Sequence, residues 1–238
     1  MRSELLELAR RLRRRVEQSH TASWNLSPKA PAVLRSPEAA ARLEAVAREI
    51  AACRRCPLWE TRSNSVPGVG PPEARVMFVG EGPGCEEDRR GEPFVGRAGE
   101  LLDRILESIG LSRGAVFIGN VVKCRPMKDP RTPALRGNDR PPTADEAASC
   151  RPYLADQIRI VAPRVIVALG AVAARALLGS DEPIGRIRGQ WREYRDGGLV
   201  VKLLPTYHPA ALLRNPELKK DVWKDVRALK AALEAGAP

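Results

Sequence analysis

The chain lacks any long apolar run and any sign of a secretion signal. No apolar segment approaches the roughly 18–20 residues that a membrane-spanning helix needs, so we expect no membrane contact. Residues 1–16 are charged and lack the apolar core of a signal peptide, so we expect a cytoplasmic protein. The five cysteines are odd in number, and without a secretion signal they favour a metal or cluster over disulfides.

Acidic residues are also scarce relative to basic ones. The chain has 40 Lys and Arg residues against 29 Asp and Glu residues, which gives a formal net charge of +11. A polyanion such as nucleic acid is the natural partner of that charge, because Lys and Arg release counterions from phosphate backbones. A generally basic, solvated surface explains the charge equally well, so charge alone does not decide the partner.

The N-terminal part of the chain differs in composition from the rest. Residues 1–18 space their apolar side chains as an amphipathic helix does, and residues 19–37 are rich in Ser, Pro and Ala. We therefore predict an N-terminal helix and linker over 1–37, followed by one domain over 38–238. Within that domain Ser36 and Pro37 predict the start of a helix that ends near Ala52.

Short apolar runs alternate with helical patterns along the domain. Such alternation predicts an α/β fold: a three-layer α/β/α sandwich around a four-stranded parallel sheet. Ligands in such folds bind beyond the carboxyl ends of the strands. The predicted strands are Arg75–Val79, Ala115–Asn120, Arg164–Leu169 and Leu199–Leu204, and the helical patterns lie near Arg97–Ile109, Thr143–Val161, Ala171–Leu178 and Glu217–Ala235.

Four of the cysteines form a recognisable set. Cys53 and Cys56 make a C-x-x-C pair, and Cys124 and Cys150 are each followed by Arg-Pro. A close pair with two remote cysteines can supply four thiolates to a [4Fe–4S] cluster, and zinc accepts the same ligands. The pattern favours the cluster slightly, because zinc sites more often show two close pairs. Cys85 stands apart in a Gly-rich loop and is not expected to be a ligand.

The loops after the strands contain the polar residues that could act on a ligand. Glu81 follows the first strand in GEGPG, and Phe94 lies between glycines at 91–96. Glu81 could activate a water, and an open Phe94 ring could stack on a base. Each has a plainer interpretation, as a solvated turn residue and as a core side chain respectively.

Two further strand ends add an amide and an imidazole. Asn120 ends the second strand and could present a donor and an acceptor to a base edge, although it could equally cap a turn. Of the two histidines, His20 lies in the predicted linker, whereas His208 follows the fourth strand. His208 is therefore the candidate catalytic imidazole.

Together these segments resemble the uracil-DNA glycosylase superfamily, and specifically its family-four enzymes, which contain an iron–sulfur cluster. The resemblance spans roughly residues 52–233. The matching segments are GEGPG at 80–84, GEPFVGRAGELLD at 91–103, GNVVKCRP at 119–126, PRVIVALG at 163–170 and TYHPAALLRNP at 206–216.

The resemblance implies a DNA repair enzyme that flips uracil from DNA and hydrolyses its N-glycosidic bond, giving free uracil and an abasic site. It implies that domain 38–238 holds a structural [4Fe–4S] cluster on Cys53, Cys56, Cys124 and Cys150. The expected partner is uracil-containing DNA, single- or double-stranded, and we expect a monomer.

Residue roles in the uracil pocket follow from the same resemblance. Phe94 stacks on the flipped base, Asn120 reads its edge, and His208 donates toward O2, where charge develops. Glu81 positions the attacking water or steadies the cationic sugar, and the amides near Gly82 and Gly84 contact the base. Three further residues complete the set: Glu87 beside the pocket, Leu212 as the apolar wedge with Ala211 and Leu213 beside it, and Arg214 on a flanking phosphate.

Two departures from the family pattern leave alternatives open. Cys85 occupies a position where an acidic or small residue is usual, which leaves room for a glycosylase of deaminated purines. The Met127–Pro142 stretch is longer than usual and contains no histidine, which disfavours the covalent capture of DNA seen in a related branch. It predicts DNA contacts through Arg131, Arg136 and Arg140, or else a disordered surface loop. A non-catalytic uracil-DNA binder is the remaining alternative.

Overall fold

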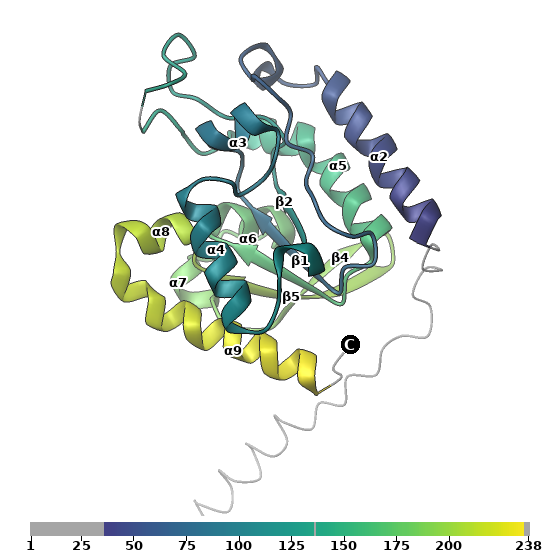
Figure 1. Cartoon of the computed structure of the whole chain (residues 1–238), viewed down its shortest axis with the longest axis vertical. Helices are drawn as coiled ribbons and strands as arrows, with labels where there is room; N and C mark the ends of the chain where they lie inside the picture. The colour runs from purple at the N-terminus through teal and green to yellow at the C-terminus, as the bar shows by residue number, and fades with distance from the viewer. Residues whose placement is uncertain (1–35, 136, 236–238) are drawn as a thin grey trace, which may run out of the picture. The chain divides into compact units, whose positions relative to one another are not determined.

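A computed structural model describes residues 36–135 and 137–235, which fold into alternating strands and helices (Figure 1). Of the helix and linker predicted over residues 1–37, residues 1–35 lie outside the described residues. The α-helices are α2 (Ser36–Ala52), α3 (Cys85–Arg90), α4 (Arg97–Ser108), α5 (Ala144–Val161), α6 (Ala171–Leu178), α7 (Ile184–Ile187), α8 (Pro209–Arg214) and α9 (Lys219–Glu234). Short 3-10 helices are η1 (Pro57–Glu60), η2 (Arg113–Ala115) and η3 (Pro216–Leu218).

The predicted parallel sheet is present, and it contains one strand more than predicted. Its order is β2-β1-β3-β5-β4, with β1 (Val76–Gly80), β2 (Phe117–Asn120), β3 (Val165–Leu169) and β5 (Leu199–Thr206) mutually parallel. The additional strand, β4 (Arg192–Asp196), runs antiparallel to β5 at the edge of the sheet. The expected count of four strands is therefore one too few.

Edge strand β4 was missed because its sequence, REYRD, is almost entirely polar. Only Tyr194 of the strand is buried, so no apolar alternation marks it. The strand instead follows from its partner, since Gly197 and Gly198 adopt positive φ angles of 52° and 88° and form the tight turn into β5.

Two apolar layers cover the two faces of the sheet. Alternate residues of β1 point to opposite sides: Met77 and Val79 pack with α2, α5 and α6, whereas Val76 and Phe78 pack with α4, α8 and α9. This alternation is what a strand period of two produces when both faces are covered. The α/β/α sandwich expected from the sequence is therefore confirmed.

Local signals fixed the helix starts well. α2 begins at Ser36 with Pro37 in its first turn, where a missing N–H costs nothing. α5 begins with a capping box, in which Thr143 Oγ1 accepts from the Glu146 amide at 3.2 Å and Glu146 accepts from the Thr143 amide at 2.7 Å. Within residues 36–135 and 137–235, no helix is long and apolar enough to cross a membrane.

Candidate functional site

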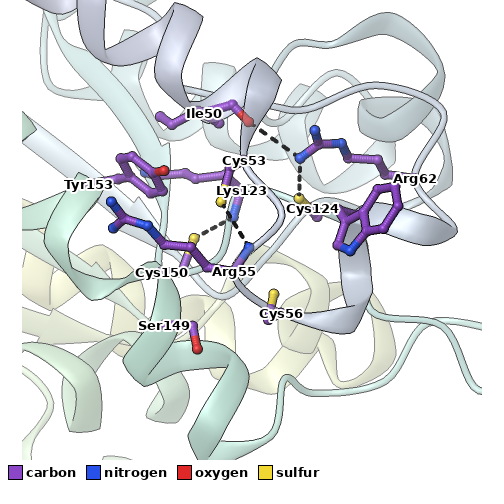
Figure 2. A pocket seen from close by; sticks show the side chains of 11 residues that line it. Ile50, Cys53, Arg55, Cys56, Arg62, Lys123, Cys124, Ser149, Cys150 and Tyr153 are labelled. Carbon is purple, nitrogen blue, oxygen red and sulfur yellow. Dashed lines mark hydrogen bonds between the residues drawn. The ribbon is translucent and has the colours of Figure 1, made fainter.

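Four cysteines from three parts of the chain surround one hollow, as Figure 2 shows. Cys53 follows the end of α2 and Cys56 precedes η1, so the C-x-x-C pair forms one wall. Cys124 follows β2, and Cys150 lies on α5. Ile50, Trp59 and Tyr153 complete the lining with apolar surface. The four residues predicted as ligands are therefore brought together, whereas Cys85 lies elsewhere, at the first position of α3.

Positive charge and N–H donors point at these sulfurs. Arg62 Nη1 donates to Cys124 Sγ at 3.0 Å and to the Ile50 carbonyl at 3.3 Å (Figure 2). The Lys123 amide donates to Cys150 Sγ at 3.3 Å, and the Arg55 amide donates to Cys53 Sγ at 3.5 Å. Such donors favour the thiolate form, which is the form that ligates metal. A hollow of this kind suits an anionic, thiolate-bound group.

The thiols themselves are costly to ionise without a metal. Burial raises the pKa of Cys150 to about 11, and it also raises the pKa of Cys124 and of Cys56. Binding of metal at these sulfurs would therefore release protons and contribute folding free energy.

The chemistry of the donor set fits two kinds of group, because zinc and an iron–sulfur cluster both accept four thiolate ligands. Within residues 36–135 and 137–235, no group of three or more His, Cys, Asp or Glu side chains is arranged so that it could hold a metal ion. What the structure shows is one hollow lined by the four cysteines.

A second site lies where β1 and β2 end side by side, with Gly80 paired to Asn120. A Cβ atom built on Gly80 would lie 2.5 Å from Asn120 Oδ1 and 2.6 Å from Phe94 Cζ. Only glycine fits there, so the absent side chain lets the Asn120 amide and the Phe94 ring close over the strand end. The predicted stacking ring and the predicted reading amide are therefore neighbours.

The Asn120 amide has an unusual feature. Asn120 is 1% exposed, and its Oδ1 atom has no hydrogen-bond partner among the residues described. A buried acceptor without a donor costs about 1–3 kcal/mol, so such atoms in native proteins call for a reason. A ligand that donates a hydrogen bond to Oδ1 would remove this cost.

Phe94 is held in a backbone conformation that its residue type rarely adopts. Its φ angle is 54°, in the left-handed region, and its ring is 5% exposed. Gly99 permits this, because a Cβ there would lie 1.8 Å from the Phe94 carbonyl oxygen. Arg113 fixes the segment further by donating to the carbonyls of Phe94, at 3.0 Å, and of Pro93. Strain held by several surrounding contacts is typical of functional positions.

His208 faces the same ring. Its imidazole centroid lies 5.4 Å from that of Phe94, and its Nδ1 accepts from the Ala210 amide at 3.1 Å. Because Nδ1 is an acceptor, the neutral ring must have its proton on Nε2, which is then the donor. Burial, with a smaller contribution from the Arg214 cation, lowers the pKa of His208 to about 4. At neutral pH His208 is therefore an uncharged Nε2–H donor.

Glu81 follows β1 and is half-buried. Burial raises the pKa of its carboxyl group above the usual range, and the Arg214 cation opposes that rise. A carboxylate with a raised pKa is a better proton acceptor than an ordinary surface Glu. Its position beside Gly80 and Gly82 fits the role of a base near the pocket.

Glu87 holds two loops together through their backbones. One carboxylate oxygen accepts from the Val95 and Gly96 amides, both at 2.9 Å, and the other accepts from the Gly84 amide at 3.2 Å. These contacts make Glu87 the support of the loops around Phe94 and Gly84. Gly82 is closely packed as well, since a Cβ there would lie 2.7 Å from Val122 Cγ2.

Helix α8 places its two leucines on different faces. Leu212 is 2% exposed and packs into the core between the sheet, α4 and α9, so its side chain does not face solvent. Leu213, one residue further on, is 38% exposed. A helix turns 100° per residue, which rotates adjacent leucines to different faces. Arg214 is exposed beside Leu213, as a phosphate contact requires.

The Met127–Pro142 loop is closed by its own contacts. Asn138, only 3% exposed, donates to the carbonyls of Asp129 and Thr132, and buried Arg125 donates to Asp139 at 2.6 Å. Arg140 pairs with Glu146 at 2.7 Å and so anchors the loop, while its DNA contact stays a prediction. Arg131 is 88% exposed, although it pairs with Asp129 in the same loop. Arg136 lies outside the described residues.

Two basic side chains near the cysteines, Lys123 and Arg62, were not predicted from the sequence. Lys123 is 1% exposed, and its Nζ donates to the Asn120 carbonyl at 2.8 Å and to Gln157 Oε1 at 2.7 Å. Burial lowers the pKa of Lys123 to about 8. The available signal was the position of this lysine, directly before a candidate ligand cysteine and after an apolar run. Arg62 left no such signal, because its contact with Cys124 is long-range.

The fold and the two sites define a class of protein. A buried aromatic ring, a buried acceptor without a partner and an uncharged imidazole lie at the carboxyl ends of the strands of an α/β sandwich, and the chain also contains a four-thiol centre. That combination suits recognition of a flat, hydrogen-bonding heterocycle.

Comparison with known proteins makes the class specific. A family model described as the uracil DNA glycosylase superfamily matches residues 67–230. The chain is 42% identical over 198 residues to the Type-4 uracil-DNA glycosylase of Saccharolobus solfataricus, covering 81% of this chain and 87% of that protein. It is 46% identical over 178 residues to the Type-4 enzyme of Pyrobaculum aerophilum, covering 73% and 86%. It is 43% identical over 195 residues to that of Thermotoga maritima, covering 81% and 95%. The chain belongs to the uracil-DNA glycosylase superfamily.

Proposed function

We propose that this protein is a DNA repair glycosylase that flips uracil out of DNA and hydrolyses the bond between the base and the sugar. The observation that carries this proposal is the partnerless Oδ1 of Asn120 beside the Phe94 ring. Uracil presents an N3–H donor to such an acceptor, and its O4 can accept from the same amide. Cytosine offers a lone pair at N3, which would face Oδ1 unfavourably. Asn120 thus reads the base edge, and Phe94 supplies the stacking surface.

Departure of the base leaves negative charge on uracil. When the C1′–N1 bond breaks, its electron pair leaves with the base, and the charge spreads onto O2 and O4. The neutral His208 donates from Nε2 toward O2, where it stabilises the developing charge. A neutral imidazole suits this role because it gives up little solvation when the site closes on DNA.

The sugar carbon that loses the base then gains water. Glu81 holds that water and accepts its proton as the oxygen bonds to C1′, and its carboxylate also steadies the cationic sugar. Its raised pKa improves its capacity as a base. The Gly82 and Gly84 amides contact the base, while Glu87 holds their loop in place. The departing uracil anion takes up a proton in place of the one that Glu81 accepts from water, so the products are free uracil and an abasic site.

We further propose that Cys53, Cys56, Cys124 and Cys150 hold a [4Fe–4S] cluster. The thiol donor set, the hollow that it surrounds and the donors from Arg62 and Lys123 fit that group. When bound, the cluster supplies a rigid covalent tie between α2, the end of β2 and α5. This chain's own residues perform the excision.

DNA is the partner that the proposal requires. Arg214 on α8 is placed for a flanking phosphate, and the exposed Leu213 beside it is the apolar side chain free to fill the stack. We propose a monomer that acts in the cytoplasm on uracil in single- or double-stranded DNA.

An excision assay tests the proposal. The iron-loaded protein is incubated with oligonucleotides that contain one uracil, cytosine, thymine, hypoxanthine or xanthine, and alkali-labile breaks and free base are measured. We expect many turnovers on uracil and none on cytosine or thymine. Stoichiometric release or none would make the protein a binder, and release of hypoxanthine or xanthine at the uracil rate would make it a broad deaminated-base glycosylase.

A further inference from the structure

The end of β2 contains a buried cation whose place in the fold is unusual. Lys123 is 1% exposed, and fully buried lysines are rare unless their ammonium groups are paired. Its Nζ donates to the Asn120 carbonyl at 2.8 Å and to Gln157 Oε1 at 2.7 Å. Gln157 is in turn fixed, because its Nε2 donates to the Pro67 carbonyl at 2.6 Å. The ammonium group is therefore held at a defined point beneath the strand end.

The carbonyl that Lys123 holds belongs to the residue that reads the base. The side chain of Asn120 is aimed by its backbone, and that backbone lies where the β ladder stops. On its β1 side the ladder still reaches this loop, since the Val121 amide donates to the Gly80 carbonyl at 2.9 Å. The Asn120 carbonyl itself accepts from the lysine of its own loop. The four-residue segment from Asn120 to Lys123 thus closes on itself.

The same residue also touches the cysteine centre. The Lys123 backbone amide donates to Cys150 Sγ at 3.3 Å, and the next residue is Cys124 (Figure 2). Its side chain thus contacts the Asn120 backbone, while its backbone amide contacts Cys150 Sγ. A displacement of either cysteine would shift the point from which Nζ reaches Asn120.

We infer that Lys123 is a positioning residue for uracil recognition, which holds the Asn120 amide in register with the base and ties its position to the cysteine centre. The inference rests on the proposed function, because it takes Asn120 as the uracil reader. It separates Lys123 from an ordinary fold-stabilising residue: its contribution to excision passes through the Asn120 side chain and disappears when that side chain is removed.

A double-mutant cycle tests this directly. Lys123→Met, Asn120→Ala and the double variant are compared with the parent protein, all matched in iron content. The readouts are the single-turnover excision rate and the affinities for DNA with a non-cleavable 2′-fluorinated deoxyuridine and for uracil-free DNA. We expect Lys123→Met to lower the rate and the uracil-specific affinity about tenfold or more, the equivalent of one lost charged hydrogen bond. Affinity for uracil-free DNA should change less than about twofold.

The second leg of the cycle is decisive. In the Asn120→Ala background, Lys123→Met should lower the rate by less than about twofold, because contacting residues are non-additive. Arg125→Met is the matched control, since Arg125 is an equally buried cation beside Cys124 that holds Asp139 and Pro133 instead. Its effect should add to that of Asn120→Ala. A Lys123 cycle as additive as the Arg125 cycle overturns the inference.

One replacement variant and one alternative readout keep the double-mutant cycle interpretable. If Lys123→Met does not fold, Gln157→Met replaces it, since Gln157 holds Nζ in place. We expect a smaller loss that is again absent in the Asn120→Ala background, and an additive loss overturns the inference. If the parent protein releases no uracil, the proposed function fails. The cycle is then read on affinity for the fluorinated uracil DNA, where additivity would separately contradict the role of Lys123.

Discussion

The cysteine centre and the base-recognition site share the short segment from Asn120 to Cys124, and they differ in how their polar atoms are hydrogen-bonded. Around the sulfurs, donors from Arg62, Arg55 and the Lys123 backbone are already engaged. At the strand ends, the Asn120 Oδ1 atom is buried without a partner, and the His208 ring lies with its centroid 5.4 Å from that of the strained Phe94. In a site that maintains the fold, the polar groups are hydrogen-bonded to one another. In a site that binds a transient ligand, some polar atoms have no protein partner and are free to bond to the ligand.

The largest effect is expected from a substitution in the cysteine centre. Cys124→Ala should cost the protein its broad visible absorbance, reduce bound iron from about four atoms per chain, and lower its resistance to thermal unfolding. Cys85→Ala is the matched control and should retain iron and stability, because Cys85 is outside the hollow. Iron analysis and thermal unfolding measure both. Full iron content in the Cys124 variant would contradict the ligand assignment.

Changes in the pocket should leave the cysteine centre intact. Asn120→Ala and His208→Ala should each lower the single-turnover excision rate about 100- to 1000-fold, the usual cost of losing a donor or reader aimed at developing charge. Iron content and affinity for uracil-free DNA should stay near those of the parent. Activity near the parent value in both variants would show that base recognition lies elsewhere.

The two leucines of α8 separate packing from DNA contact. Leu212→Ala should lower the free energy of unfolding by about 2–4 kcal/mol, because it opens a cavity in the core. Leu213→Ala should cost less than about 1 kcal/mol, yet slow excision from double-stranded DNA more than from single-stranded DNA, since only the duplex leaves a gap to fill. Urea unfolding and rates on both substrates measure this. The reverse pattern would return the wedge to Leu212.

The smallest expected effect concerns acid. The pKa of His208 is about 4 in the folded protein and about 6.5 in the unfolded chain, so the unfolded chain binds more protons in that window. Stability should therefore be fully present above pH 6.5 and decline as the pH falls toward 4. From pH 7 to 5 the parent should lose at most about 2 kcal/mol more than His208→Gln, since His208 is partly exposed. Equal losses in urea unfolding would contradict a neutral His208 in the folded protein.

Local sequence signals carried much of the fold. Both apolar faces of β1 and the Thr143–Glu146 capping box were readable because they depend on neighbours within a few positions. The strand β4 was not readable, because its stability comes from pairing with β5 and from the Gly197–Gly198 turn. The different burial of Leu212 and Leu213 was not readable for a similar reason, since the rotation of α8 depends on what its buried face packs against.

The sequence by itself determined which chemical groups this protein offers. They are four thiols, one candidate imidazole, one strand-end amide and a Gly-rich loop, in an order that matches one family. Those properties follow from residue type and spacing. Only the tertiary structure decided which polar atoms have hydrogen-bond partners and which do not. The partnerless Oδ1 of Asn120 and the buried Lys123 depend on how segments far apart in the chain pack together, and the tautomer of His208 depends on the backbone geometry at the start of α8.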